Sequence, residues 1–402
     1  MRIRIVTLGC KLNFAESSAL MNTLLERGHQ RAAQGEEADV VIVNTCTVTD
    51  TADHKNRQAI HRLKRENPHA RIIVTGCYAR LRPQEIADMA EVNHVVQKPL
   101  DRFVPARSKG DRTRCFLKVQ DGCNYFCTYC TIPMARGRSR NPAIAEVVRD
   151  ARQALHEGAK EIVLTGVNIG DFGRSTGERF IDLLQALDEI SNENPYRLRI
   201  SSCETTLLTD EIIDFVARSL HFAPHFHIPL QSGSDTVLRI MNRHYDTALF
   251  RERIEHIRRV MPSAFIGVDC MVGVRGETEE CFEEYVRFIE SLDVSQLHVF
   301  TYSERANTRM VAMNDLPVVP MPERERRSKI LHDISESKLD FFYGRYKNGS
   351  HTVLWESRND NGMMYGFTEN YIKLSRPYDA NRINRFERIK VSPWLSLFRA
   401  ED

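Results

Sequence analysis

Three cysteines stand close together in the segment DGCNYFCTYC, where Cys123, Cys127 and Cys130 have the spacing Cys-x3-Cys-x2-Cys. Thiolates hold iron–sulfur clusters, and electron carriers usually use four of them. A cubane cluster held by only three would keep one iron open, and an open metal position is where a substrate or cofactor binds. A zinc finger would need two further ligands at defined spacing, which do not follow here. The spacing therefore predicts a cluster with one exchangeable position.

A second set of cysteines, Cys10, Cys46 and Cys77, lies in the first hundred residues. Each follows a short apolar run typical of a buried parallel strand, at residues 2–9, 39–45 and 71–76. Helical patterns separate the runs, which predicts right-handed βαβ crossovers and a doubly wound parallel α/β domain. Ligands of such sheets bind beyond the carboxyl ends of the strands. We therefore expect these three cysteines to converge on one site, although unrelated core cysteines would be the simpler explanation for any one of them.

Composition narrows the class of protein. The 402 residues suggest two or three domains, and 42% hydrophobic with 27% charged residues is ordinary for a globular chain. The formal net charge of +2 says nothing about a nucleic-acid partner. No apolar run approaches the roughly 20 residues of a membrane helix, and no segment targets the chain for export. We therefore expect a cytoplasmic protein without a membrane partner, whose ten cysteines are ligands or core residues rather than disulfides.

The rest of the chain predicts two further domains. Six more strand-like runs alternate with amphipathic helices, at residues 115–120, 160–166, 196–202, 226–231, 264–273 and 296–302. This series fits a partial (β/α)6 barrel over residues 109–335, after an N-terminal α/β domain at residues 1–108. A charged helix follows the barrel. Residues 340–402 then predict a small antiparallel β-barrel, with strands expected at residues 351–356, 363–375 and 385–392.

The segment around Cys123, with the aromatic Tyr129 just before the last cysteine, resembles the radical S-adenosylmethionine (SAM) family. The resemblance implies that the open iron binds the amino and carboxylate groups of SAM, and that reduction cleaves SAM to a 5′-deoxyadenosyl radical. It also implies cofactor contacts from later strand ends, which we assign to Tyr129, Gly166, Asn168, Glu204, Gln231, Ser232 and Asp269. Strand-end capping is the alternative role for Glu204 and Gln231.

The whole chain resembles the methylthiotransferase family of radical SAM enzymes, through LGCKLNFAES, VNTCTVT, VTGCYA, CNYFCTYCTIP, HIPLQSGS and GETEECFEE. The resemblance implies that Cys10, Cys46 and Cys77 hold a second [4Fe–4S] cluster, which carries the sulfur to be inserted. The implied reaction replaces C–H by C–S–CH3, and SAM is both the methyl donor and the radical source. We therefore expect two [4Fe–4S] clusters, a sulfur source and an electron donor of the flavodoxin or ferredoxin type.

Within this family, the runs TIPMARGRSRN, LTGVNIGDFG and HVFTYSER are most similar to the tRNA threonylcarbamoyladenosine methylthiotransferases. Those enzymes modify carbon 2 of the hypermodified purine next to the anticodon, so the expected partner is a tRNA anticodon loop. Two other substrates stay open: isopentenyladenosine in tRNA and an aspartate of a ribosomal protein. Outside the enzymes, an RNA-binding protein whose cysteines hold a structural metal is the alternative.

Basic and aromatic residues suggest where RNA could bind. The tail looks like a TRAM module, a small β-barrel associated with RNA binding, although it lacks the glycine usual near Arg385. A basic face with aromatic rings suits phosphates and base stacking. The candidates are Arg136, Arg138 and Arg140 beside the first cysteine set, and Tyr371, Arg385 and Arg388 in the tail. The cysteines outside both sets, Cys115, Cys203, Cys270 and Cys281, are expected to be packing residues.

Overall fold

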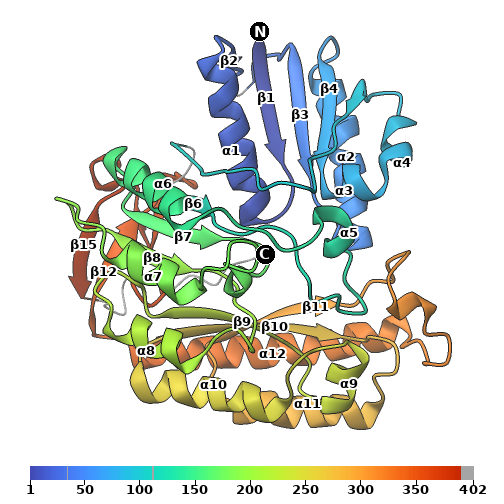
Figure 1. The fold of residues 1–402 in the computed structure, drawn as a ribbon, viewed down its shortest axis with the longest axis vertical. Helices are drawn as coiled ribbons and strands as arrows, with labels where there is room; N and C mark the ends of the chain where they lie inside the picture. Colours follow the sequence, from blue (N-terminus) through green and yellow to red (C-terminus); the bar gives the residue numbers. More distant parts are fainter. Residues whose placement is uncertain (34, 111–112, 391–402) are drawn as a thin grey trace.

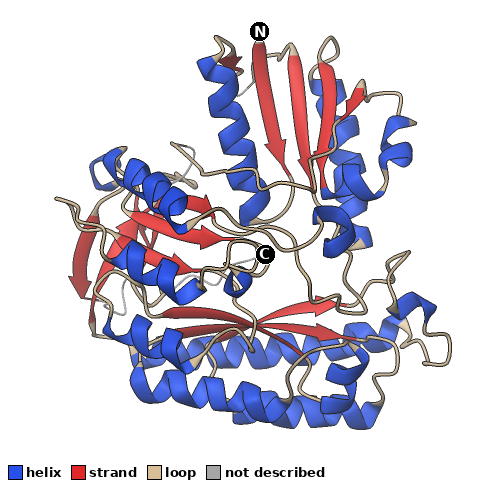
Figure 2. Cartoon of the chain, viewed as in Figure 1, coloured by secondary structure: helices blue, strands red, loops and turns tan. Residues whose placement is uncertain are grey.

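A computed structural model describes residues 1–33, 35–110 and 113–390. Figure 1 shows an N-terminal α/β domain above a central barrel, with a small sheet packed at the side of the barrel. Figure 2 shows that helices cover the outer faces of the barrel strands. Within the described residues, no helix is both long and apolar enough to cross a membrane.

The N-terminal domain is a five-stranded parallel sheet in the order β2-β1-β3-β4-β5. Its strands are β1 (Arg2–Thr7), β2 (Gln30–Arg31), β3 (Val40–Thr45), β4 (Arg71–Gly76) and β5 (His94–Val95), and its helices are α1 (Lys11–Glu26), α2 (Asp50–Glu66), α3 (Cys77–Leu81) and α4 (Pro83–Ala87). The β-branched run of β3 is buried throughout, as expected of a central parallel strand. The predicted doubly wound parallel domain is confirmed, and the arrows of β1, β3 and β4 run toward the barrel (Figure 1).

The central barrel consists of two parallel three-stranded sheets, β6-β7-β8 and β9-β10-β11. The strands are β6 (Arg114–Lys118), β7 (Glu161–Thr165), β8 (Arg197–Ile200), β9 (His225–Gln231), β10 (Phe265–Val272) and β11 (Gln296–Thr301). Parallel bridges pair Leu198 with Phe222 and Ser202 with His227, and these join the two sheets between β8 and β9. Among the described residues β6 and β11 do not pair, so the barrel is open on that side. The predicted partial (β/α)6 barrel is confirmed.

Amphipathic helices cover the outside of the barrel. They are α6 (Ile144–His156), α7 (Phe180–Asp188), α8 (Asp210–Arg218), α9 (Asp235–Ile240), α10 (Thr247–Val260), α11 (Glu279–Ser291) and α12 (Met321–Arg345), and the short α5 (Ile132–Arg136) lies in the loop after β6. Strand residues such as Leu117, Leu164 and Ile266 join the apolar core beneath these helices. Because side chains alternate along a strand, their neighbours face the barrel interior.

The tail forms an antiparallel sheet in the order β14-β13-β12-β15, as expected of an antiparallel β module. Its strands are β12 (Ser350–Trp355), β13 (Met363–Phe367), β14 (Lys373–Pro377) and β15 (Phe386–Lys390). The run 363–375, expected as one strand, divides into β13 and β14. The reason is a turn in which the backbone N–H of Ile372 donates to the hydroxyl of Thr368 at 2.8 Å and Tyr371 adopts φ 65°. Residues 391 and 392 of the last expected strand lie outside the described residues.

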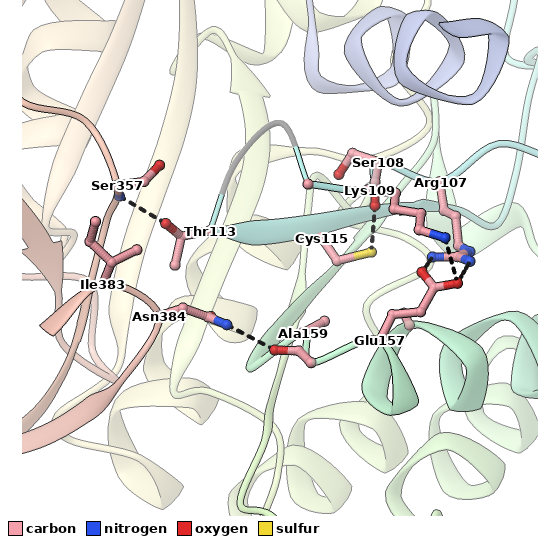
Figure 3. A pocket seen from close by; sticks show the side chains of 13 residues that line it. Arg107, Ser108, Lys109, Thr113, Cys115, Glu157, Ala159, Ser357, Ile383 and Asn384 are labelled. Atoms are coloured by element: carbon pink, nitrogen blue, oxygen red, sulfur yellow. Dashed lines mark hydrogen bonds and ion pairs between the residues drawn. The ribbon is translucent and has the colours of Figure 1, made fainter. Parts of the chain in front are cut away.

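Polar contacts attach the tail to the barrel. Figure 3 shows one junction, where the side chain of Asn384 donates to the carbonyl of Gly158 at 2.9 Å and the backbone N–H of Ser357 donates to Thr113 at 3.0 Å. These residues line a cavity of about 230 Å³. The thiol of Cys115 lies at the same junction and donates to the carbonyl of Ser108 at 3.3 Å, so Cys115 is a packing residue.

Two arginines of β8 make a second, buried junction. Arg197 and Arg199 bracket the fully buried carboxylate of Glu161, with nitrogen–oxygen distances of 3.1 and 2.9 Å. Their remaining N–H groups donate to tail carbonyls, among them that of Thr352 at 2.9 Å from Arg197 and that of Thr368 at 3.4 Å from Arg199. One carboxylate inside the barrel thus orients the arginines that hold the tail.

Replacing Arg199 by methionine is therefore expected to destabilise the chain by about 3–5 kcal/mol, the usual result of removing one member of a buried ion pair. The reason is that Glu161 would stay buried with one guanidinium fewer. Denaturant unfolding followed by circular dichroism measures the change. Arg388→Ala, at an exposed position of β15, is the control and is expected to lie within about 0.5 kcal/mol of wild type. Equal stability of Arg199→Met and wild type would contradict this account.

Candidate functional site

The structure brings Cys10, Cys46 and Cys77 together at the carboxyl edge of the N-terminal sheet. Cys10 caps α1 after β1, Cys46 follows β3 and Cys77 begins α3 after β4, and these three strands are neighbours in the sheet. The loops approach closely, since a β-carbon at Gly9 would lie 2.6 Å from the β-carbon of Cys46. The expected convergence at one edge is therefore present.

The three thiols differ in exposure. Cys10 is exposed, whereas Cys46 and Cys77 are buried. Burial, together with the charges of Cys77 and Cys10, raises the pKa of Cys46 to about 12. Burial also raises the pKa of Cys77, an effect that the positive charge of Arg136 opposes. The edge thus carries three thiols close enough to affect one another, one of them open to solvent.

Cys123, Cys127 and Cys130 lie in the loop between β6 and α5. At Gly122 this loop passes close to the backbone of Arg138. The φ of Gly122 is +71°, and a β-carbon there would lie 2.1 Å from the carbonyl oxygen of Arg138. Burial raises the pKa of Cys123 to about 11 and of Cys130 to about 12, and the charge of Cys127 adds to both shifts. Backbone N–H groups point at two of the sulfurs, from Tyr125 to Cys123 at 3.5 Å and from Ile132 to Cys130 at 3.4 Å.

Both trios fit the donor set of an iron–sulfur cluster. Thiolates are the ligands such clusters require, and N–H groups aimed at the sulfurs stabilise their negative charge. Among the described residues, no group of three His, Cys, Asp or Glu side chains is placed to hold a single metal ion. By the type of its donors, each trio could hold three corners of a cubane cluster and would leave the fourth corner without a protein ligand.

A buried ion pair lies beside the loop that carries Cys123, Cys127 and Cys130. The guanidinium of Arg243 donates to the carboxylate of Glu204 at 2.6 Å and to the sulfur of Cys127 at 3.1 Å. Burial raises the pKa of Glu204 despite this partner. The phenol of Tyr129 is buried next to the same arginine, and burial holds its pKa well above its ordinary value. Arg243 was missed by the sequence analysis, since it lies in a loop with no metal-ligand spacing or motif to mark it.

The other predicted cofactor residues lie at the carboxyl ends of barrel strands. At the turn after β7, the backbone N–H groups of Val167 and Asn168 both donate to the side-chain oxygen of Gln120 at 2.9 Å. At Gly166, a β-carbon would lie 2.9 Å from that oxygen, so the turn requires glycine. Within the described residues, the side-chain oxygens of Asn168 and Gln231 are buried without a hydrogen-bond partner. Unpartnered buried oxygens of this kind suit a site that binds a polar ligand.

Two further predicted residues, Asp269 and Ser232, have hydrogen-bond partners within the protein. Asp269, in the middle of β10, lies 2.7 Å from the imidazole Nε2 of His227. Burial would raise the pKa of Asp269, but His227, by its charge and hydrogen bond, together with the charges of His298 and Arg243, lowers it. Ser232 is buried directly after β9, where its hydroxyl accepts a hydrogen bond from the backbone N–H of Ser234 at 3.3 Å. Asp269 therefore lies deeper in the barrel than the strand-end group around Glu204.

Arg136, predicted to contact RNA, is placed by the structure between the barrel and the N-terminal domain. Arg136 is 5% exposed, and its guanidinium pairs with Glu16 of α1 and with Asp121, both at 3.1 Å. It also donates to the side chain of Asn13. The charge of Arg136 acts on Cys10 and Cys77, so this arginine connects the barrel loop to the edge that carries the other cysteine set. Both Glu16 and this connection were missed because ion pairs far apart in sequence leave no local pattern.

Two other residues predicted to contact RNA, Arg140 and Tyr371, make contacts within the protein. Arg140 pairs with Asp121 at 3.1 Å and donates to backbone carbonyls, including that of Arg102 at 2.9 Å, so it is a structural residue. The ring of Tyr371 packs against His225 and Phe367, with centroids 4.7 and 4.8 Å apart, at the junction of tail and barrel. The candidates that stay exposed are Arg138, Arg385 and Arg388.

A second arginine crosses the same interface. Arg305, after β11, donates to the hydroxyl of Thr47 at 2.6 Å and pairs with Asp53 at 2.7 Å. Thr47 directly follows Cys46. The segment HVFTYSER contains Arg305, but nothing in the sequence shows that this arginine turns back to the N-terminal domain. Arg136 and Arg305 thus hold the N-terminal domain from two sides of its cysteine edge.

Two family models match the chain. Residues 2–97 match Uncharacterized protein family UPF0004, and residues 117–289 match the Radical SAM superfamily. Among solved structures, the chain is similar to the radical SAM methyltransferase TsrM from Kitasatospora setae, with a TM-score of 0.52, 15% identity and 75% of each chain covered. A likeness at this identity concerns the fold.

Relatives match over nearly the whole length. The chain is 37% identical to the threonylcarbamoyladenosine tRNA methylthiotransferase MtaB of Bacillus subtilis, with 96% of this chain and 92% of that protein covered. It is 33% identical to the protein of the same name from Aquifex aeolicus, with 94% and 97% covered. The tRNA-2-methylthio-N(6)-dimethylallyladenosine synthase of Bifidobacterium adolescentis is also 33% identical, with 84% and 78% covered. The chain therefore belongs to the radical SAM tRNA methylthiotransferase family.

Proposed function

We propose that this chain converts N6-threonylcarbamoyladenosine next to the tRNA anticodon to its 2-methylthio derivative. The observation that carries the proposal is the connection between the two cysteine trios. Arg136 lies six residues after Cys130 in the chain. Its guanidinium pairs with Glu16 of α1, the helix whose N-cap is Cys10. A reaction that makes a radical at one site and adds sulfur from another needs the two sites to face one chamber.

We assign Cys123, Cys127 and Cys130 to one [4Fe–4S] cluster and Cys10, Cys46 and Cys77 to a second. When bound, these groups supply reductive cleavage of SAM and delivery of sulfur. We propose that residues 1–108 deliver the sulfur, that residues 109–335 carry out the radical step and that residues 340–402 contact RNA. An electron donor of the flavodoxin or ferredoxin type and a sulfur source complete the proposed partners in the cytoplasm.

The protein's own residues orient the cofactor. Arg243 holds the carboxylate of Glu204 near Cys127, and this carboxylate could accept a hydrogen bond from the amino group of SAM. The unpartnered oxygens of Asn168 and Gln231 offer acceptors to the amino or ribose hydroxyl groups. The remaining proposed contacts are Tyr129, Gly166, Ser232 and Asp269. For RNA, we propose the exposed Arg138, Arg385 and Arg388, which can meet phosphates without breaking an internal pair.

Among the family's substrates, relatives named for threonylcarbamoyladenosine match up to 37% identity over 96% of this chain. Those named for dimethylallyladenosine match at 33% over 84%, or at 28% over 96%. This difference favours the first substrate. Mass spectrometry of nucleosides after anaerobic reaction with tRNA tests the choice, because the 2-methylthio group would appear on threonylcarbamoyladenosine and not on isopentenyladenosine. The opposite distribution would overturn the proposal.

Substituting the two cysteine sets one at a time is expected to separate cleavage of SAM from addition of the methylthio group. Reconstituted wild type should contain about eight irons, and the triple variant C10A/C46A/C77A about four. That variant should still cleave SAM to 5′-deoxyadenosine but add no methylthio group, because only the radical site remains. Cys127→Ala should lose both activities, and Cys281→Ala, on α11, is the control. Eight irons in the triple variant would show that the first three cysteines hold no cluster.

Thiol alkylation offers a second test. In the metal-free chain at pH 8, iodoacetamide should modify the exposed Cys10 well before Cys46, whose pKa of about 12 leaves it almost wholly protonated and unreactive. Peptide mass spectrometry follows both sites over time. After anaerobic reconstitution, Cys10 should become protected as well. Continued labelling of Cys10 in protein that contains eight irons would contradict its assignment as a ligand.

A further inference from the structure

The first turn of α1 lies against the interior of the barrel. Phe14 packs edge-on against Phe116 of β6, with ring centroids 5.8 Å apart, and Ala15 joins the same cluster with Val163 of β7. Phe116 and Val163 face inward, since their strand neighbours belong to the core beneath the outer helices. Residues three and four apart share one face of a helix. Lys11, three residues before Phe14 and directly after Cys10, therefore lies on the face of α1 that is turned to the barrel.

The charge of Lys11 acts on two residues where the barrel meets the tail, His225 and Tyr371. Burial lowers the pKa of His225, and the charges of Arg199 and Lys11 lower it further. Burial alone would raise the pKa of Tyr371, but the charges of Arg114 and then Lys11 outweigh it and bring the value to about 8. Lys11 thus reaches from the N-terminal domain toward a group of residues from the barrel and the tail.

Lys11 differs from the other cations of this region because it lacks a partner. Arg114 pairs with Glu356 at 2.9 Å, Arg199 with Glu161 at 2.9 Å and Lys118 with Asp121 at 2.7 Å. Lys11 is exposed, and in the described part of the chain it has neither an ion pair nor a side-chain hydrogen bond. The ammonium of Lys11, the residue directly after the exposed Cys10, is therefore available to an anion that enters the barrel.

We propose that Lys11 binds the carboxylate of the threonyl substituent and so selects threonylcarbamoyladenosine over purines with an apolar N6 substituent. This inference rests on the function proposed above. Carbon 2 and carbon 6, which carries N6, flank N1 on one edge of the purine, so a base whose carbon 2 faces the sulfur site brings its N6 substituent to that side too. The ammonium of Lys11, which follows Cys10 in the chain, then meets a carboxylate, with which it forms a charge-assisted hydrogen bond. A backbone phosphate is the other anion that tRNA could offer.

The experiment compares anticodon stem-loops that carry threonylcarbamoyladenosine, its neutral methyl ester or unmodified adenosine. Wild type and Lys11→Met, both with clusters reconstituted, are assayed for kcat/KM and, by fluorescence anisotropy, for Kd. Lys11→Met is expected to lower kcat/KM for the free acid about 10- to 100-fold, the scale of one hydrogen bond to a charged group, and to leave the ester unchanged. The Kd for the free acid should rise similarly, and Lys11→Arg should restore most of the loss.

Lys329→Met removes an exposed lysine of α12 and is the matched control. An equal loss of affinity for all three stem-loops in Lys11→Met would identify a phosphate contact and overturn the proposal. Unchanged values for the free acid would also overturn it. A fourth stem-loop, which carries isopentenyladenosine, tests the proposed function itself. If wild type modified only that stem-loop, the proposed function would fail, and this result differs from both of the others. Iron content shows that Lys11→Met is correctly loaded.

Discussion

The buried guanidinium of Arg136 is the interaction on which the arrangement of the site depends. It joins the loop that carries the Cys123 set to the helix that begins at Cys10, through Glu16 and Asp121. Lys98, Lys118 and Arg140 pair with the same two carboxylates, so cationic side chains outnumber anionic ones in this network. The excess positive charge lies beside the thiols of Cys10 and Cys77, where bound thiolates would need compensation. One network therefore both links the loop of one trio to the helix that begins at the other and, through Arg136, opposes the effect of burial on the thiol of Cys77.

The parts of the site that sequence analysis could predict are those set by local patterns. A cysteine that follows a buried parallel strand must lie at the carboxyl edge, and strands in a βαβ series share that edge. The convergence of Cys10, Cys46 and Cys77 follows from these two facts. The loop of Cys123 is equally local, because all its cysteines lie within eight residues.

The arginines show why the rest could not be predicted. A basic run such as ARGRSR has the same composition whether its side chains meet phosphates or internal carboxylates. The partner of Arg136 lies 120 residues away at Glu16, and the partner of Arg305 lies 252 residues away at Asp53. Tyr371, within the run 363–375, was assigned to an RNA-binding face because a basic face with aromatic rings suits phosphates and base stacking. The turn at its centre instead directs this ring to the barrel.

The interface between the two domains combines a small apolar patch with buried ion pairs. Phe14, Ala15 and Phe116 supply part of the apolar contact. An apolar patch alone tolerates sliding, because the hydrophobic effect has no direction. The pairs of Arg136 and Arg305 do have direction, and losing one partner leaves a buried charge, which is strongly unfavourable. Since a misplacement of about 1 Å can reduce a rate about 100-fold, a reaction with two separate centres gains more from such directional contacts than from a larger apolar surface.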